Sequence, residues 1–303
     1  MPAPTQSSFA ARSSVCALLV CVALAPCRAE AQTELRWSER WARVHPASYV
    51  ASTLGVASTF AFDRFYETPS DARVRGPWLF DQDVHDALDP SSRESAELAA
   101  TLSDVLLVTL MAWPVLDALA VAGLGYQSSD VAFQLTSVFT EVLAADFILS
   151  TLIKVIVHRE RPHGEACSLA DREADPDRCG SRGRTRSFYS GHASAAFSSA
   201  GAVCMSHANL PLYADVAADI FACGAAMMTA TIVSVLRMLA ERHWASDVLV
   251  GSLMGLATGL GLPYLLHYGW DRSETTGAPP TTSPLSEAAS LAPPAQLTFG
   301  GTF

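Results

Sequence analysis

The chain has 303 residues, 50% of them hydrophobic, and its mean hydropathy is +0.23. A net charge of -10 at pH 7 gives no basic surface for nucleic acid, and no glycine-rich turn of a nucleotide site occurs, so both partner classes are excluded. Because the apolar residues gather in long blocks, the composition predicts a membrane protein.

Residues 1–31 have the pattern of a secretory signal peptide. An apolar run over residues 15–25 is followed by Ala-Glu-Ala at residues 29–31, the small-x-small arrangement of a cleavage site. Cys27 leaves a lipoprotein signal as a minor alternative, although Pro26 stands where a small residue is expected. We therefore expect a signal peptide over residues 1–31.

Five segments are long and apolar enough to span a bilayer, which takes about 20 residues. A sixth segment, Ala47 to Phe62, is shorter and diluted by serine and threonine, so it either spans, packs inside the bundle or lies at the surface. The sequence predicts an all-α transmembrane bundle of five or six spans, preceded by an N-terminal segment over residues 32–79. The five segments are Thr101 to Gly123, Val131 to Ile153, Gly191 to Leu210, Ala214 to Leu236 and Ser246 to His267.

Residues 80–88 predict a short amphipathic helix on the membrane surface. Its apolar face consists of Phe80, Val84, Ala87 and Leu88. The polar residues of the same segment lack the glycine and the terminal glutamate of a calcium loop, so we interpret them as a solvated helix face rather than a metal site. These residues are Asp81, Asp83, His85 and Asp86.

The cysteines outside the signal region fall into two pairs. Cys167 and Cys179 flank a polar loop and either form a disulfide, which would place the loop on an oxidising side such as the periplasm, or are two unrelated thiols. Cys204 and Cys223 lie in apolar segments, where cysteine behaves as a small buried hydrophobe.

Two further patterns concern packing and the end of the chain. Gly251, Gly255 and Gly259 recur every four residues, which favours close contact between membrane helices. Residues 269–303 are rich in Pro, Ser, Thr and Ala, so we expect a disordered tail.

Three groups of polar residues lie at the ends of the apolar segments, where ionisable side chains are least costly and can reach a water-facing site. Cations, a serine hydroxyl and the amides of a helix start are suited to binding a phosphate dianion. The groups are Lys154 with Arg161 and Pro162; Ser190, Gly191 and His192; and Arg237, His243 and Asp247.

In their order and spacing these groups resemble the three motifs of the type 2 phosphatidic acid phosphatase (PAP2) family, over roughly residues 80–268. Lysine, six residues, Arg-Pro matches the first motif; Ser-Gly-His matches most of the second; and arginine, five residues, histidine, three residues, aspartate matches most of the third. Tyr189 and Leu236 replace the proline and the serine that usually precede the second and third motifs. The resemblance predicts a PAP2-like membrane phosphatase domain over residues 80–268, with its active site at one membrane face.

The resemblance implies a role for each matching residue. His243 would be the nucleophile that forms a phosphohistidine, Asp247 would hold its imidazole, and His192 would be the general acid. The phosphate would be bound by Lys154, Arg161, Ser190, Gly191 and Arg237. No metal or other cofactor is implied. The expected reaction is hydrolysis of lipid phosphate monoesters or pyrophosphates within a membrane of lipids.

Two other functions stay open at this point. The resemblance extends to vanadate-dependent haloperoxidases, and a catalytically inactive lipid-binding scaffold is a rival from another class. Topology is also open: six crossings from a translocated start put the motifs in the cytoplasm, whereas five put them outside, in agreement with a disulfide in the polar loop. We expect a bacterial-type inner membrane with the site facing the periplasm; the oligomeric state is not predicted.

Overall fold

The computed structural model describes the chain except residues 1–33, 89, 91 and 270–303. The predicted signal peptide and nearly all of the predicted tail therefore lie outside the described residues. The described part is helical, and its backbone pairing of the β type is limited to one isolated bridge between Val74 and Arg159. The predicted all-α class is confirmed for this part of the chain.

The long helices are α2 (Pro46–Phe65), α4 (Arg93–Leu116), α5 (Ser129–Val157), α9 (Gly191–Asn209), α10 (Val216–Leu239) and α11 (Ala245–Leu256). π-helical turns continue two of them: η2 (Asp117–Gly125) follows α4, and η4 (Ala257–Gly261) and η5 (Tyr264–Tyr268) follow α11. The short elements are α3 (Asp81–Leu88), η3 (Pro162–Ala166), α6 (Leu169–Ala174), α7 (Pro176–Cys179) and α8 (Ser181–Thr185).

Local sequence fixes where several helices begin. Ser92 forms a capping box with Ser95 at the start of α4, each hydroxyl accepting the other residue's backbone N–H at 3.1–3.2 Å. Pro46 occupies the first turn of α2, where its missing N–H has no cost, and Asp215 caps α10 through the amide of Ala218 at 2.8 Å. These residues therefore determine where the apolar helices begin.

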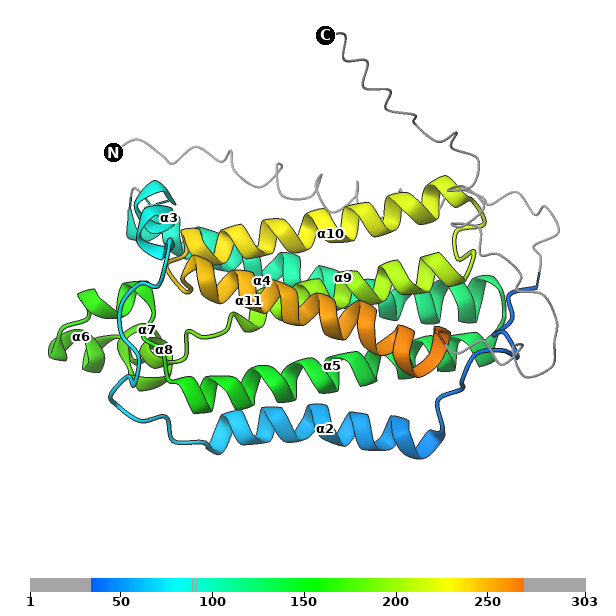
Figure 1. Cartoon of the computed structure of the whole chain (residues 1–303), viewed down its shortest axis with the longest axis horizontal. Coiled ribbons are helices and arrows are strands. Elements are labelled where there is room, and N and C mark those ends of the chain that lie inside the picture. Colours follow the sequence, from blue (N-terminus) through cyan, green and yellow to red (C-terminus); the bar gives the residue numbers. More distant parts are fainter. Residues whose placement is uncertain (1–33, 89, 91, 270–303) are drawn as a thin grey trace, which may run out of the picture. The chain divides into compact units, whose positions relative to one another are not determined.

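Helix α9 is the central element, because it contacts α4, α5, α10 and α11, while α2 packs on α5 (Figure 1). The glycines of α11 face α9. A Cβ at Gly251 would lie 2.5 Å from the carbonyl oxygen of Ser190, and one at Gly255 would overlap the carbonyl oxygen of Ser194. The prediction that the four-residue glycine spacing marks a close helix contact is confirmed.

Gly255→Ala is expected to lower the free energy of unfolding by about 1–3 kcal/mol, although alanine is the better helix former by about 1 kcal/mol. The added methyl group meets backbone, which cannot turn away as a flexible side chain can. Gly224→Ala in α10 is the matched control, because a Cβ there has open space within 4 Å. Denaturation in detergent checks both variants; equal stability of the two would contradict the packing argument.

Among the residues that the structure describes, three helical segments are long and apolar enough to cross a membrane: Arg93–Gly125, Val216–Leu239 and Ala245–Tyr268. They contain or overlap three of the predicted spans. The other predicted segments form helices α2, α5 and α9. Side chains such as Phe221 and Met228 of α10 remain exposed, as expected for a surface that faces lipid tails. The total of five or six spans stays a prediction.

Both cysteine pairs form disulfides. The bond between Cys167 and Cys179 agrees with the first alternative for the polar loop. The prediction for Cys204 and Cys223 is wrong, because they are bonded to each other rather than being independent thiols. The neighbouring helices α9 and α10 pack closely enough to bring the Cα atoms of Cys204 and Cys223 to 4.5 Å from each other. Their spacing in the sequence does not reveal this contact.

Candidate active site

The three groups of polar residues meet at one pocket of about 470 Å³. They arrive from the end of α5, the loop before η3, the start of α9, the end of α10 and the turn before α11. Six of the eight predicted site residues line the pocket: Lys154, Arg161, Gly191, His192, Arg237 and His243. The other two, Ser190 and Asp247, are fully buried and do not line it.

Ser190 has a structural task at the start of α9. Its hydroxyl accepts the backbone N–H of Ala193 at 3.3 Å, so it is the N-cap of the helix. Gly191 follows as the first helical residue, and its amide belongs to the helix terminus that attracts anions. The start of α9 thus faces the pocket with backbone donors, while the serine side chain holds the helix end.

Lys154 is the single lysine of the chain, whose 20 Lys and Arg residues are otherwise all arginines. Its ammonium donates to the hydroxyl of Ser150 at 3.2 Å, and among the described residues no carboxylate is close enough to form a salt bridge with it. Asp146, fully buried about two turns before Lys154 on α5, instead accepts a hydrogen bond from Ser194 of α9. A partly buried cation without a salt-bridge partner favours the binding of another anion.

Gly191→Ala is expected to lower kcat/KM for phosphate release about tenfold or more while leaving the fold intact, a loss of about 1.4 kcal/mol in transition-state binding. The added Cβ would overlap the ammonium of Lys154, and the flexible end of that side chain would move out of place. Steady-state kinetics and a melting curve check this prediction. A variant with unchanged kinetics would show that the position of Lys154 does not matter.

The two motif arginines are held differently. Arg237 donates to Ser103 at 3.0 Å and to Asp104 at 3.1 Å, both on α4. The guanidinium of Arg161 has no hydrogen bond or ion pair within the described ranges, and its Nε is buried. Burial and the neighbouring charges of Arg237, Arg242 and Arg186 lower the pKa of Arg161 to about 9. The pocket therefore concentrates positive charge that its own side chains do not neutralise.

His243 lies in the turn before α11 and therefore not on a continuous helix with Asp247. Its Nδ1 is 2.8 Å from the carbonyl oxygen of Ser187 but 3.8 Å from the Asp247 carboxylate. Because a carbonyl only accepts, Nδ1 carries the hydrogen and Nε2 is left with a free lone pair. The carbonyl of Ser187 thus holds this tautomer of His243 directly.

The surroundings keep His243 neutral. Burial lowers its pKa well below the usual value, and the positive charges of Arg161 and Arg237 act in the same direction. A neutral imidazole with an unprotonated Nε2 is the form in which histidine can act as a nucleophile.

Asp247 belongs to a buried network that the sequence did not indicate. One carboxylate oxygen accepts from Arg159 at 2.7 Å, and the other accepts from the hydroxyl of Ser187 at 2.5 Å and from the amide of Trp244 at 2.9 Å. Since Ser187 also accepts the hydrogen of His243, Asp247 acts on the histidine through Ser187.

Arg159 joins this network to α3. It is fully buried, donates to Asp81 at 2.6 Å and to the hydroxyl of Ser246 at 2.7 Å, and its guanidinium carbon lies 4.0 Å from the ring centroid of Trp78. The interpretation of Asp81 as part of a solvated face is wrong, because its side chain is completely buried. Burial alone would raise the pKa of Asp81, but hydrogen bonds from Arg159 and Ser246 outweigh it and lower the pKa.

Asp104 of α4 is a second residue that the sequence analysis missed. It accepts from Arg237 and is 2.8 Å from Nε2 of His192, so this ring nitrogen carries a hydrogen. A signal existed, because a carboxylate inside an apolar span is usually functional. Asp104 and Ser103 also explain how Arg237 is held although Leu236 replaces the usual serine.

Tyr189, which replaces the usual proline before the second motif, is an interior residue. Its side chain is 1% exposed, and it does not line the pocket. It is therefore neither at the substrate entrance nor at a membrane interface, but part of the interior beside the start of α9.

One wall of the pocket is apolar. Phe60 of α2, Leu107 and Met111 of α4, and Phe147 of α5 line it together with the polar groups. The pocket thus has cations at one end and an apolar wall that can contact a hydrocarbon chain. No group of three or more His, Cys, Asp or Glu side chains that could hold a metal ion occurs within the part of the chain that the structure describes.

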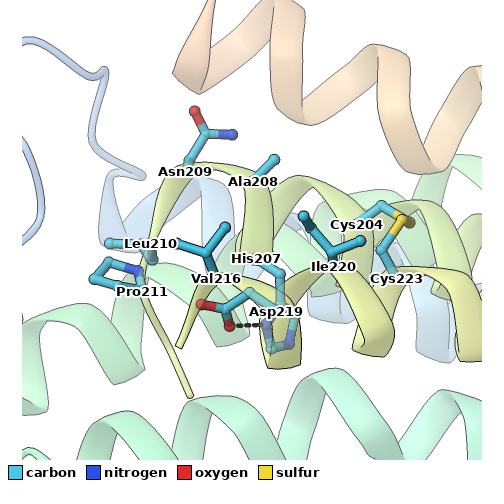
Figure 2. A pocket seen from close by; sticks show the side chains of 10 residues that line it. All are labelled: Cys204, His207, Ala208, Asn209, Leu210, Pro211, Val216, Asp219, Ile220 and Cys223. Carbon is cyan, nitrogen blue, oxygen red and sulfur yellow. Dashed lines mark hydrogen bonds and ion pairs between the residues drawn. A yellow bond between two sulfur atoms is a disulfide. The ribbon is translucent and has the colours of Figure 1, made fainter. Parts of the chain in front are cut away.

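A second cavity, of about 300 Å³, lies between α9 and α10 and contains none of the motif residues (Figure 2). His207 borders it and bonds Asp219 at 2.6 Å and Asp117 at 3.2 Å. Because His207 is 15 residues after His192 on α9, it lies about 22 Å along the helix axis from the first pocket. This cluster ties α9 to α10 and η2, remote from the candidate active site.

Comparison with known proteins gives one match. The profile of the PAP2 superfamily matches residues 135–271, which include all eight predicted site residues. Residues 135–271 belong to the PAP2 superfamily. Neither the curated proteins nor the solved structures yielded a match to the chain.

The PAP2 assignment confirms the resemblance seen in the motifs, and it implies a phosphoesterase-type enzyme or, within the same superfamily, a haloperoxidase. The matched segment begins inside α5. Helices α3 and α4 precede it. Asp81 of α3 accepts a hydrogen bond from Arg159, and Asp104 of α4 accepts one from Arg237.

Proposed function

We propose that this protein is a metal-independent phosphatase that hydrolyses lipid phosphate monoesters or pyrophosphates through a phosphohistidine at His243. One observation carries the proposal: Lys154 and Arg161, two cations without a carboxylate partner in the described part of the chain, share a pocket with a histidine whose Nε2 lone pair is free. Cations without an internal counter-charge beside a neutral nucleophile fit a phosphate ester better than an uncharged substrate.

The reaction would run in two steps. Nε2 of His243 attacks phosphorus, the bond from phosphorus to the leaving oxygen breaks, and that oxygen takes a proton from His192. Water then attacks the phosphohistidine and returns a proton to His192, while the P–N bond breaks and phosphate leaves. Lys154, Arg161, Arg237 and the amide of Gly191 would stabilise the charge on the phosphoryl oxygens in both steps.

The lipid nature of the substrate is supported by the apolar wall of the pocket. Phe60 and Phe147 pack against each other, with ring centroids 5.8 Å apart, and border the pocket together with Leu107 and Met111. An acyl or prenyl chain would lie along this wall with its phosphate directed to Lys154. The same membrane that surrounds the exposed apolar helices would supply such a substrate.

The orientation and extent of the catalytic unit are part of the proposal. The disulfide between Cys167 and Cys179 lies in the loop between the first two motifs, which supports a site on the oxidising, periplasmic face of a bacterial-type inner membrane. The contacts of Arg159 with Asp81 and of Arg237 with Asp104 support a catalytic unit that begins near residue 80.

Phosphate release from a panel of lipid phosphates, by detergent-purified protein in excess EDTA, tests the function. Chelator-resistant release is the expected result. Labelling supplies a second readout: because Lys154 is the single lysine, its modification by an amine-directed reagent can be read on the one lysine-containing peptide, apart from the α-amino group, and phosphate should slow it. Vanadate-dependent bromide oxidation without phosphate release would favour the haloperoxidase. Protection of Lys154 without turnover would favour the inactive scaffold.

A further inference from the structure

A second group of cations borders the same pocket. Arg182 in α8 and Arg186 just after it line the pocket together with Lys154 and Arg161, although they belong to none of the three motifs. They lie on the side formed by the end of α2, where both contact Asp63. Arg182 also donates to the backbone carbonyl of Tyr66, just after α2, at 3.0 Å.

Charge is not balanced in this group. Of the described residues that line the pocket, Asp63 is the one carboxylate. It bonds Arg186 through one oxygen and Arg182 through the other, at 3.3 Å, so a single negative charge is shared by two guanidinium groups. The side chain of Arg186 is 7% exposed, and its Nε is buried without a hydrogen-bond partner. A net positive charge therefore remains beside Lys154 and Arg161.

This positive charge exceeds what one phosphate group requires. Arg237 is paired with Asp104, but Lys154 and Arg161 alone already match the two negative charges that a single phosphoryl group carries at most. The charge of Arg186 is among those that lower the pKa of Arg161, so the two groups are electrostatically coupled. A second anion next to the first would neutralise the remaining charge and satisfy the free donor of Arg186.

We propose that Arg186, supported by Arg182, binds a second phosphate group, so that the preferred substrate is a lipid diphosphate. This inference rests on the proposed function of the pocket. The terminal phosphorus is attacked by Nε2 of His243, and the phosphate next to the lipid lies at Arg186, on the side of Phe60. The bond from the terminal phosphorus to the bridging oxygen breaks, and the leaving group is a lipid monophosphate. Water then releases inorganic phosphate from His243.

The test compares a long-chain alkyl diphosphate with the monophosphate of the same chain, and inorganic pyrophosphate serves as the soluble arm. The wild-type protein should have a higher kcat/KM for the lipid diphosphate than for either other substrate. Arg186→Gln should lower the ratio of kcat/KM for diphosphate to that for monophosphate about tenfold or more, as expected for a lost charge-assisted hydrogen bond. Arg182→Gln, at a half-exposed side chain, should lower the ratio in the same direction without endangering the fold.

Arg64→Gln is the matched control, because it removes the same charge from the last turn of α2 outside this pocket, and the substrate ratio should not change. A wild-type preference for the monophosphate, or equal losses on both lipid substrates in the Arg186 and Arg182 variants, would overturn the inference while the phosphatase stands. A preference for inorganic pyrophosphate would replace the lipid by a soluble substrate and overturn it as well.

Binding without turnover separates this inference from the proposed reaction. A methylene-bridged lipid diphosphonate should protect Lys154 from amine labelling at lower concentration than the monophosphonate, and Arg186→Gln should remove that advantage. If the protein hydrolyses none of the substrates but this protection holds, the diphosphate site stands and the phosphatase reaction fails. If the two phosphonates protect equally, the second phosphate site is refuted.

Discussion

His243→Ala is expected to lower phosphate release about a thousandfold or more, because the variant lacks the atom that forms the covalent intermediate. The fold should survive, since the change removes one buried hydrogen bond, to the carbonyl of Ser187, with a net contribution of about 0.5–1.5 kcal/mol. Phosphate release in EDTA and a melting curve measure the two effects separately.

A direct signature of the intermediate completes this prediction. Substrate labelled at the terminal phosphate and quenched in base should leave label on the wild-type protein, in an acid-labile form, and none on His243→Ala. His45→Ala is the matched control, because His45 is an exposed histidine at the start of α2, and it should keep both label and turnover. Label on the His243 variant would assign the nucleophile to another residue.

The motifs predicted the pocket because their chemistry is local. Lys154, Arg161 and the Ser-Gly-His run each sit where a helix ends or begins, and helix ends gather at one side of an antiparallel bundle. The periodic glycines of α11 likewise predicted its contact with α9, since a four-residue spacing defines one face of a helix. Patterns within one segment were thus sufficient for the class of fold and for six of the residues that line the pocket.

Contacts between distant segments escaped prediction. Asp81 looked like a solvated residue because its acidic neighbours do face water, and its partner Arg159 is 78 residues away. Cys204 and Cys223 meet only because α9 and α10 pack with a particular register. His243 donates to the carbonyl of Ser187, and backbone acceptors leave no trace in a residue pattern. Such pairs are brought together by the tertiary structure, and the residue pattern of a single segment does not reveal them.

Arg159→Met is expected to destabilise the protein strongly. It would leave the carboxylates of Asp81 and Asp247 at 0% exposure without their cation, and breaking a buried ion pair costs about 3–5 kcal/mol. Arg159→Lys should be intermediate, because one ammonium cannot match the fork of donors that reaches Asp81, Asp247 and Ser246. Arg43→Met is the control: Arg43 pairs with Asp130 at a half-exposed site, where the loss should be about 0–1 kcal/mol.

Kinetics distinguish a positioning residue from one that acts through stability alone. Arg159 holds Asp247, Asp247 accepts from Ser187, and Ser187 holds the imidazole of His243. In Arg159→Lys, measured where the variant is fully folded, kcat should therefore fall about tenfold or more with little change in KM, since the reacting histidine is displaced and the phosphate-binding cations are untouched. The double variant Arg159→Met with Asp81→Asn should regain stability, because one buried charge is gone, but not kcat, because Asp247 still lacks its cation. Full recovery of kcat in the double variant would mean that Arg159 serves only to anchor α3.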